Sequence, residues 1–82
     1  MYYTYILESK SNKGTRYIGH TEDLRKRLVY HNAGKCRHTS KYLPWKLKLY
    51  VAFEDIKYAQ HFKRYLKSGS GHSFAKRHFG CE

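Results

Sequence analysis

The chain has 82 residues, of which 17 are lysine or arginine and six are acidic, so its formal net charge is +11. A chain of this length supports one hydrophobic core, and we expect a single domain over residues 1–82. So much positive charge on a small domain favours a polyanionic partner, and nucleic acid is the expected one. No apolar stretch approaches the roughly 18 residues of a membrane-spanning helix, and no signal peptide or lipidation motif is recognisable, so we expect a cytoplasmic protein without membrane attachment.

The first half of the chain predicts a β-hairpin followed by a helix. Residues 2–7 and 15–19 are rich in aromatic and β-branched side chains and are separated by polar residues, which is typical of two paired strands. A helix is expected over residues 22–32, with Thr21 as its N-cap. Gly34 is expected to end it.

The second half predicts a basic loop, a third strand and two further helices. Residues 35–41 are polar and lack periodicity, so we expect an exposed loop. Apolar residues alternate over 46–53, as in a strand, and Asp55 is placed to cap a helix that continues to Lys67. Ser70 is expected to cap a short last helix. The order ββαβαα predicts an α+β fold, in which helices flank a three-stranded, mainly antiparallel sheet.

Two polar side chains are predicted on the apolar stripe of the first helix. At 100° per residue, Arg27 and His31 fall on the same side as Leu24 and Leu28. Arginine is suited to hold a phosphate with two parallel hydrogen bonds. The alternatives are that Arg27 stacks on a tyrosine and that His31 is a structural histidine at the helix end.

Several short motifs resemble the GIY-YIG nuclease family. The segment Tyr3-Thr4-Tyr5 is similar to its Gly-Ile-Tyr element, with tyrosine in place of glycine, and Tyr17-Ile18-Gly19 matches its second element. The segment from Ala59 to Lys76 is similar to the C-terminal helix, glycine turn and basic end of small single-domain members described as endonucleases or excision-nuclease-like proteins. Further residues follow the family's spacing: Thr21, Asp23, Leu24, Arg27 and His31.

The resemblance implies phosphodiester hydrolysis with a divalent metal, Mg²⁺ or Mn²⁺, and water as the nucleophile, in DNA repair or recombination. It assigns Tyr5 and Tyr17 to activation of the water, Arg27 to the phosphate, and His31 to a supporting polar role. His20 directly follows the second motif and is a further candidate for binding. The structural alternative for either tyrosine is core packing with a satisfied hydroxyl.

Lys63 stands where this family has its metal-binding glutamate. An ammonium has no lone pair for Mg²⁺, and no acidic residue occurs between Ile56 and Gly80, so we assign no metal ligand. Helical spacing from Ala59 predicts that Lys63 points inward with Ile56 and Leu66. We therefore expect weak or absent metal-dependent cleavage. The alternatives are a metal-independent or partner-completed hydrolase that uses Lys63, and a glutamate deliberately replaced to inactivate the enzyme.

Basic residues outside these motifs are expected to contact phosphates without reading the base sequence. The complete predicted nucleic-acid-binding set is His20, Lys35, Arg37, Lys41, Lys63, Lys67, Lys76 and Arg77. We favour DNA over RNA, expect no small-molecule cofactor, and keep open a non-catalytic module that binds nucleic acid or a protein partner.

A zinc site is a weaker hypothesis. Cys36, His38, His78 and Cys81 are zinc-ligand types, but the spacing of the first pair is not that of a zinc finger. We expect both cysteines to be reduced.

Overall fold

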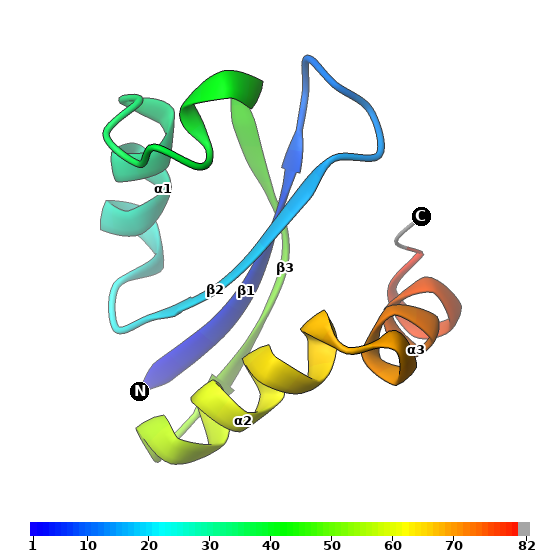
Figure 1. Cartoon of the computed structure of the whole chain (residues 1–82). Helices are drawn as coiled ribbons and strands as arrows, with labels where there is room; N and C mark the ends of the chain where they lie inside the picture. The colour runs from blue at the N-terminus through cyan, green and yellow to red at the C-terminus, as the bar shows by residue number, and fades with distance from the viewer. Residues whose placement is uncertain (81–82) are drawn as a thin grey trace.

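The sheet has three strands, all antiparallel, in the computed structural model, which describes residues 1–80. Strand β1 (Tyr2–Ser9) lies in the centre, between β2 (Arg16–Thr21) and β3 (Trp45–Phe53), as Figure 1 shows. The predicted hairpin is confirmed, and each strand is one or two residues longer than its sequence pattern indicates.

Helices cover both faces of this sheet (Figure 1). Helix α1 (Leu24–Asn32) lies on one face, and α2 (Ile56–Lys67) and α3 (Gly69–Phe79) lie on the other. The short 3-10 helix η1 (Ser40–Tyr42) precedes β3. The observed order confirms the predicted ββαβαα, α+β architecture. None of the helices described in residues 1–80 is long and apolar enough to cross a membrane.

Strand β1 supplies both hydrophobic clusters because its side chains alternate between the two faces. Tyr5 and Leu7 join Trp45 in the cluster beside α1. Ile6 joins Leu66 in the cluster beside α2 and α3. The central strand therefore contributes to the core on both sides of the sheet, and its residues Thr4 to Leu7 are almost completely buried.

The first helix begins later than predicted. The carboxylate of Asp23 accepts a hydrogen bond from the Lys26 amide at 3.0 Å and caps α1, so the helix begins at Leu24. Thr21 is not the cap, because it still belongs to β2 and its hydroxyl accepts from the Asp23 amide at 3.2 Å. Gly34 ends the helical segment as predicted, with φ of +74°.

The turn between α2 and α3 depends on Ser68 and Gly71. The Ser68 hydroxyl accepts from the Gly71 amide at 3.1 Å and donates to the Tyr65 carbonyl at 2.6 Å. The prediction that Ser70 caps the last helix is therefore wrong, since the helix begins at Gly69. A Cβ on Gly71 would collide with the Tyr65 carbonyl, so this glycine allows the two helices to approach closely.

Two predictions of exposure need correction. The basic loop is not exposed throughout, because Thr39 is buried and the segment continues into η1. On α2, Ile56 is 40% exposed instead of pointing inward, since it occupies the first turn of the helix, beyond the apolar cluster.

Candidate active site

Tyr5 and Tyr17 lie on the α1 face of the hairpin, as their strand positions predict. In the antiparallel register Tyr5 is opposite Gly19 and Tyr17 is opposite Leu7. The two tyrosines are therefore diagonal neighbours on one face, with ring centroids 6.3 Å apart. Tyr5 is 1% exposed, whereas Tyr17 is only half-buried.

Gly19 provides the space that the Tyr5 ring occupies. A Cβ at this position would lie 2.5 Å from the Tyr5 hydroxyl oxygen and 2.7 Å from Cζ. Both distances are shorter than non-bonded carbon contacts allow. The glycine of the Tyr-Ile-Gly element is therefore required by a side chain of the neighbouring strand.

Helix α1 brings His31 and Arg27 to the Tyr5 hydroxyl. His31 is completely buried, and its Nε2 is hydrogen bonded to that hydroxyl at 3.0 Å. The Arg27 Nε–H donates to the same oxygen at 3.4 Å. Three of the four residues that the family resemblance assigns to catalysis are thus joined directly, and Tyr17 completes the group through its ring, 4.9 Å from that of His31.

Thr39 extends this group, and the sequence analysis did not identify it. Its hydroxyl is hydrogen bonded to His31 Nδ1 at 2.9 Å and donates to the Cys36 carbonyl at 3.4 Å. The Trp45 indole N–H donates to the Thr39 carbonyl at 2.8 Å. A threonine in a basic, non-periodic loop gives no sequence signal of such a role.

Burial sets the ionisation of these groups. Burial raises the pKa of Tyr5, although the hydrogen bond from Arg27 acts in the opposite direction, and burial likewise raises the pKa of Tyr17. Burial and the charge of Arg27 lower the pKa of His31. Both phenols are therefore protonated and the imidazole is neutral at pH 7. Tyr5 is too buried to meet a substrate water, which leaves Tyr17 as the phenol that solvent can reach.

Arg27 is half-buried and lines a cavity of about 160 Å³ with Asp23, Lys26 and Tyr30. The guanidinium carbon lies 4.8 Å from the centroid of the Tyr30 ring, so the predicted stacking on a tyrosine does occur. Within residues 1–80, hydrogen bonding engages its Nε and leaves both terminal nitrogens available. Stacking and phosphate binding are therefore compatible for this residue.

Lys63 lies on the opposite face of the sheet from Tyr5. The Thr4 hydroxyl donates to the Ala59 carbonyl at 2.6 Å, and this bond fixes α2 on β1. On the neighbouring strand, His20 is opposite Thr4 and therefore lies on the same face of the sheet as Thr4 and α2. Lys63 lies on α2, one helical turn beyond Ala59. Lys63 is half-buried and not fully inward as predicted, because a lysine stem can cover apolar surface while its ammonium stays in water.

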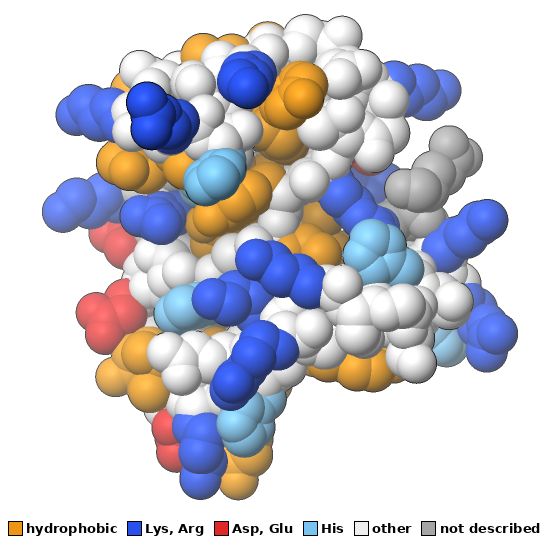
Figure 2. Space-filling model, viewed as in Figure 1, with side chains coloured by type: hydrophobic (Ala, Val, Ile, Leu, Met, Phe, Trp, Pro, Cys, Tyr) orange, Lys and Arg blue, Asp and Glu red, His pale blue; other side chains and the backbone are white. Residues whose placement is uncertain are grey.

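Several basic side chains lie near one another at the β2 edge of the sheet. Burial lowers the pKa of His20, and Lys63, Arg27 and Lys67 lower it further. Burial and the neighbouring Lys67 and Arg64 lower the pKa of Lys63. Figure 2 shows Lys, Arg and His side chains gathered between the part of the surface that carries α1 and the part that carries α2. The edge strand β2 thus separates two groups of cations that face the same solvent region.

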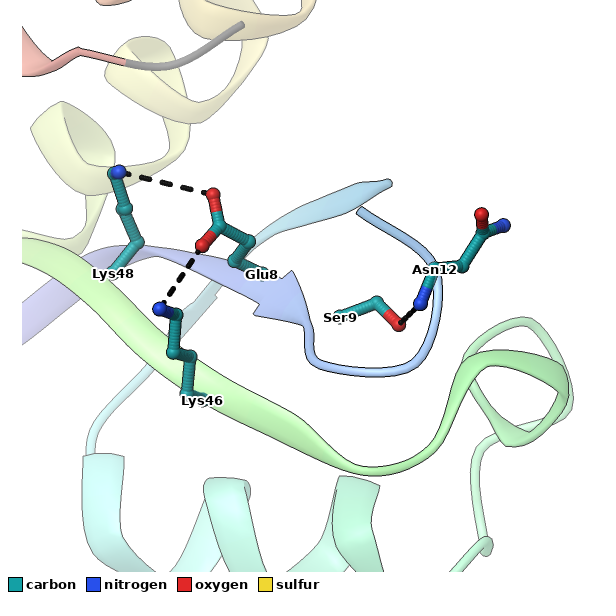
Figure 3. Close-up of polar contacts among 5 residues, drawn as sticks. All are labelled: Glu8, Ser9, Asn12, Lys46 and Lys48. Carbon is teal, nitrogen blue, oxygen red and sulfur yellow. Dashed lines mark hydrogen bonds and ion pairs between the residues drawn. The ribbon is translucent and has the colours of Figure 1, made fainter. Parts of the chain in front are cut away.

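The remaining predicted contacts are exposed but scattered. Arg37 and Lys41 line a shallow cavity of the loop with His38. Two other basic residues, Lys46 and Lys48, share the single carboxylate of Glu8 at 3.2 and 3.7 Å, so one of their two charges is compensated (Figure 3). The remaining exposed members of the predicted set are Lys35 beside the loop, Lys67 at the end of α2, and Lys76 and Arg77 on α3.

The donor set does not suit a divalent metal. No cluster of three or more His, Cys, Asp or Glu side chains that could hold a metal ion occurs within the described part of the chain. The Lys63 ammonium, at the position where the family resemblance predicts the ligand, offers only hydrogen-bond donors. Cys81, one of the four residues in the zinc hypothesis, lies outside the described residues.

The chain matches a known family model and is similar to several bacterial proteins. A family model described as the GIY-YIG catalytic domain matches residues 1–77. UPF0213 protein YsiG of Lactococcus lactis subsp. lactis (strain IL1403) is 46% identical over 55 residues, which are 66% of this chain and 51% of that protein. UPF0213 protein SpyM50708 of Streptococcus pyogenes serotype M5 (strain Manfredo) is 44% identical over 54 residues, 65% of this chain and 56% of that protein.

A further relative, UPF0213 protein spr1390 of Streptococcus pneumoniae (strain ATCC BAA-255 / R6), is 48% identical over 46 residues, 55% of this chain and 44% of that protein. The matched segments span about half the length of these relatives. The family match, in contrast, includes both tyrosine motifs, Arg27, His31 and the position of Lys63. The chain therefore belongs to the GIY-YIG catalytic domain family.

Proposed function

We propose that this protein binds nucleic-acid phosphodiesters, DNA in the first instance, and that it has weak or no metal-dependent cleavage activity. The observation that supports binding is the arrangement of Arg27. Its Nε is held by the Tyr5 hydroxyl, and the residue lines a cavity together with Lys26 and Asp23. A guanidinium fixed in this way is suited to bidentate contact with a phosphate.

The groups around Arg27 suit a phosphodiester more than a smaller anion. Lys63 and Lys67 place further positive charge across the β2 edge, beside the imidazole of His20, where a continuous polyanion would meet both groups of cations. Hydrolysis would additionally require that a water lose its proton while negative charge on the phosphate is stabilised. Of the two site tyrosines, Tyr17 is the half-buried one that solvent can reach, and its raised pKa disfavours the phenolate.

The expected loss of metal-dependent cleavage follows from Lys63. A divalent metal contributes several kcal/mol to stabilising charge on a reacting phosphate, which corresponds to orders of magnitude in rate. The Lys63 ammonium can attract the phosphate as a point charge but cannot bind the metal. We infer a domain of nuclease descent that retains the phosphate site.

Binding is tested by fluorescence anisotropy with labelled single-stranded and duplex DNA and RNA. Arg27→Ala should weaken binding by roughly tenfold, as expected when a charge-assisted pair worth about 1.5 kcal/mol is lost. Arg25→Ala is the matched control, because Arg25 is exposed on the same helix. Failure of the wild-type protein to bind any of these probes would contradict the proposal and favour a role in binding a protein partner.

Cleavage is tested with the Lys63→Glu variant. It should cleave the same oligonucleotides in Mg²⁺ or Mn²⁺, whereas Lys63→Gln, which removes the charge without adding a carboxylate, should not. Wild-type cleavage that requires the metal and disappears in Arg27→Ala would show that Lys63 does not silence the site. Gel analysis of end-labelled products over time measures each outcome.

A further inference from the structure

We propose that Thr39 is a positioning residue, which holds His31 in the Nδ1–H tautomer and thereby sets the direction of the hydrogen bonds that orient Arg27. Only the effect on nucleic-acid affinity rests on the proposed function. The tautomer itself is a property of the folded protein.

The direction of the chain of hydrogen bonds starts at a backbone carbonyl. The Thr39 hydroxyl lies 3.4 Å from the Cys36 carbonyl oxygen and 2.9 Å from His31 Nδ1. A carbonyl can only accept, whereas His31 Nδ1 can accept the Thr39 proton or donate to the Thr39 oxygen. The buried Tyr5 hydroxyl decides between the two, because within the described residues its hydrogen-bond acceptor is His31 Nε2. When Tyr5 donates to Nε2, the imidazole proton is on Nδ1 and is donated to the Thr39 oxygen, and the Thr39 proton goes to the Cys36 carbonyl.

This tautomer determines what Tyr5 does. With its proton on Nδ1, the neutral His31 has a lone pair on Nε2, which lies 3.0 Å from the Tyr5 hydroxyl. The Tyr5 proton therefore points to His31, and the oxygen remains free to accept from the Arg27 Nε–H at 3.4 Å. In the other tautomer, His31 Nε2–H would donate to the Tyr5 oxygen. The Tyr5 proton would then have to turn away from His31, into the space that the Arg27 Nε–H occupies.

The surroundings hold Thr39 in this position. Thr39 is 1% exposed, so water does not substitute for its hydroxyl. Its carbonyl accepts from the Trp45 indole at 2.8 Å, and the Trp45 amide donates to the Asn32 side-chain oxygen at 2.6 Å. The loop is therefore fixed to β3 and to the end of α1. The same loop carries Arg37 and Lys41. The buried hydrogen bonds from Thr39 through His31 and Tyr5 therefore connect this basic loop to Arg27.

The direct test is ¹⁵N NMR of the His31 ring, through correlations that distinguish protonated from unprotonated nitrogens. In the wild-type protein we expect protonated Nδ1 and unprotonated Nε2. Protonated Nε2 in the wild-type protein overturns the proposal without any variant. The near-isosteric Thr39→Val should lose the exclusive Nδ1–H form, and Thr39→Ser should keep it. The control is Ser40→Ala, which removes a hydroxyl of the same loop bonded only to the Arg37 carbonyl.

The second readout is affinity for the oligonucleotide that the wild-type protein binds. Thr39→Val should weaken binding by roughly tenfold while Thr39→Ser and Ser40→Ala remain near the wild-type value, since a tenfold change corresponds to about 1.4 kcal/mol. A folded Thr39→Val protein with the wild-type tautomer and affinity overturns the proposal. Should the wild-type protein bind no nucleic acid, the proposed function fails, and the tautomer measurement still decides the inference about Thr39.

Discussion

Single residues on the α1 face form a polar path inside an apolar cluster. Thr39, His31 and Tyr5 are almost completely buried, and each side chain is hydrogen bonded to the next one in this order. Removing one member leaves its neighbour unpaired, which costs more than the net stabilisation of one hydrogen bond. The same hydrogen bonds therefore stabilise the fold and orient Arg27.

At position 19, an added methyl group tests how tightly Tyr5 is enclosed. Gly19→Ala should lower the free energy of unfolding by about 1–3 kcal/mol, the usual cost of overpacking, because the Cβ collides with the Tyr5 ring. Gly69→Ala is the control, since nothing lies within 4 Å of its Cβ position. Urea unfolding followed by circular dichroism measures both. Equal stability of the two variants would show that the hairpin adapts without cost.

The buried imidazole should make stability depend on pH. Burial and Arg27 lower the pKa of His31 below the value of 6.5 that applies in the unfolded chain. Below about pH 6.5 the unfolded chain therefore takes up a proton that the folded protein resists, so stability falls as the pH decreases from there. His20, whose pKa burial and Lys63 also lower, acts in the same direction.

Urea unfolding at pH values between 5 and 8 measures this dependence. His31→Gln should show a smaller change in unfolding free energy with pH than the wild-type protein, whatever its absolute stability. His38→Gln serves as the control because His38 is exposed. A pH dependence that is the same in all three proteins would contradict the assignment to His31.

At the scale of elements, the sequence predicts the order and type of every strand and major helix from local signals, namely composition for the hairpin, alternation for β3, and caps and helical spacing for the helices. The alternation of apolar residues in β3, and the stripe of α1 that combines leucines with Arg27 and His31, are both local properties of the chain. Helix ends are less predictable, since several hydroxyl and carboxylate side chains near each end can form the cap. Asp23 caps α1 in place of Thr21, and Ser68 caps α3 in place of Ser70.

The site is predictable to a similar degree. The family motifs identify Tyr5, Tyr17, Arg27 and His31, and the structure brings them together. Thr39 is absent from that prediction because its partners, His31 and the Trp45 indole, come from two other elements. A contact that exists only after the elements assemble has no periodicity in the sequence.

The helix cap provides a test at this scale. Ser68→Ala should lower the free energy of unfolding by about 1 kcal/mol, because it removes the hydroxyl that accepts from the Gly71 amide and donates to the Tyr65 carbonyl. Ser70→Ala should change stability by less than about 0.5 kcal/mol, since Ser70 is an exposed residue of the first turn. Chemical denaturation of both variants provides the measurement, and a larger effect at Ser70 would contradict the assigned cap.

For the whole molecule, the sheet separates the hydrogen-bonded group at Arg27 from the cations on α2. They approach each other around β2, one of the two edge strands, where Arg27, Lys63 and Lys67 all act on His20. With a net charge of +11, and with Lys46 and Lys48 paired to Glu8 elsewhere, the uncompensated charge at this edge should dominate binding to a polyanion.

Oligonucleotide affinity should therefore fall steeply with salt. The logarithm of the binding constant should decrease linearly with the logarithm of salt concentration, with a slope of about −0.7 to −0.9 per neutralised phosphate. Lys67→Gln should make that slope shallower by about one unit, whereas Lys57→Gln, at the exposed start of α2, should leave it unchanged. Anisotropy titrations at several salt concentrations measure the slopes, and salt-independent binding would contradict the electrostatic account.

The contact between Gly19 and Tyr5 also constrains how this family can diverge. A side chain at position 19 is compatible with the hairpin only when the residue opposite it on β1 is small enough to vacate the space of the phenol ring. The two tyrosine motifs, although separated by a loop, should therefore change together over evolution. Sequences that lose the glycine should also lose the tyrosine, and with it the anchor for the arginine.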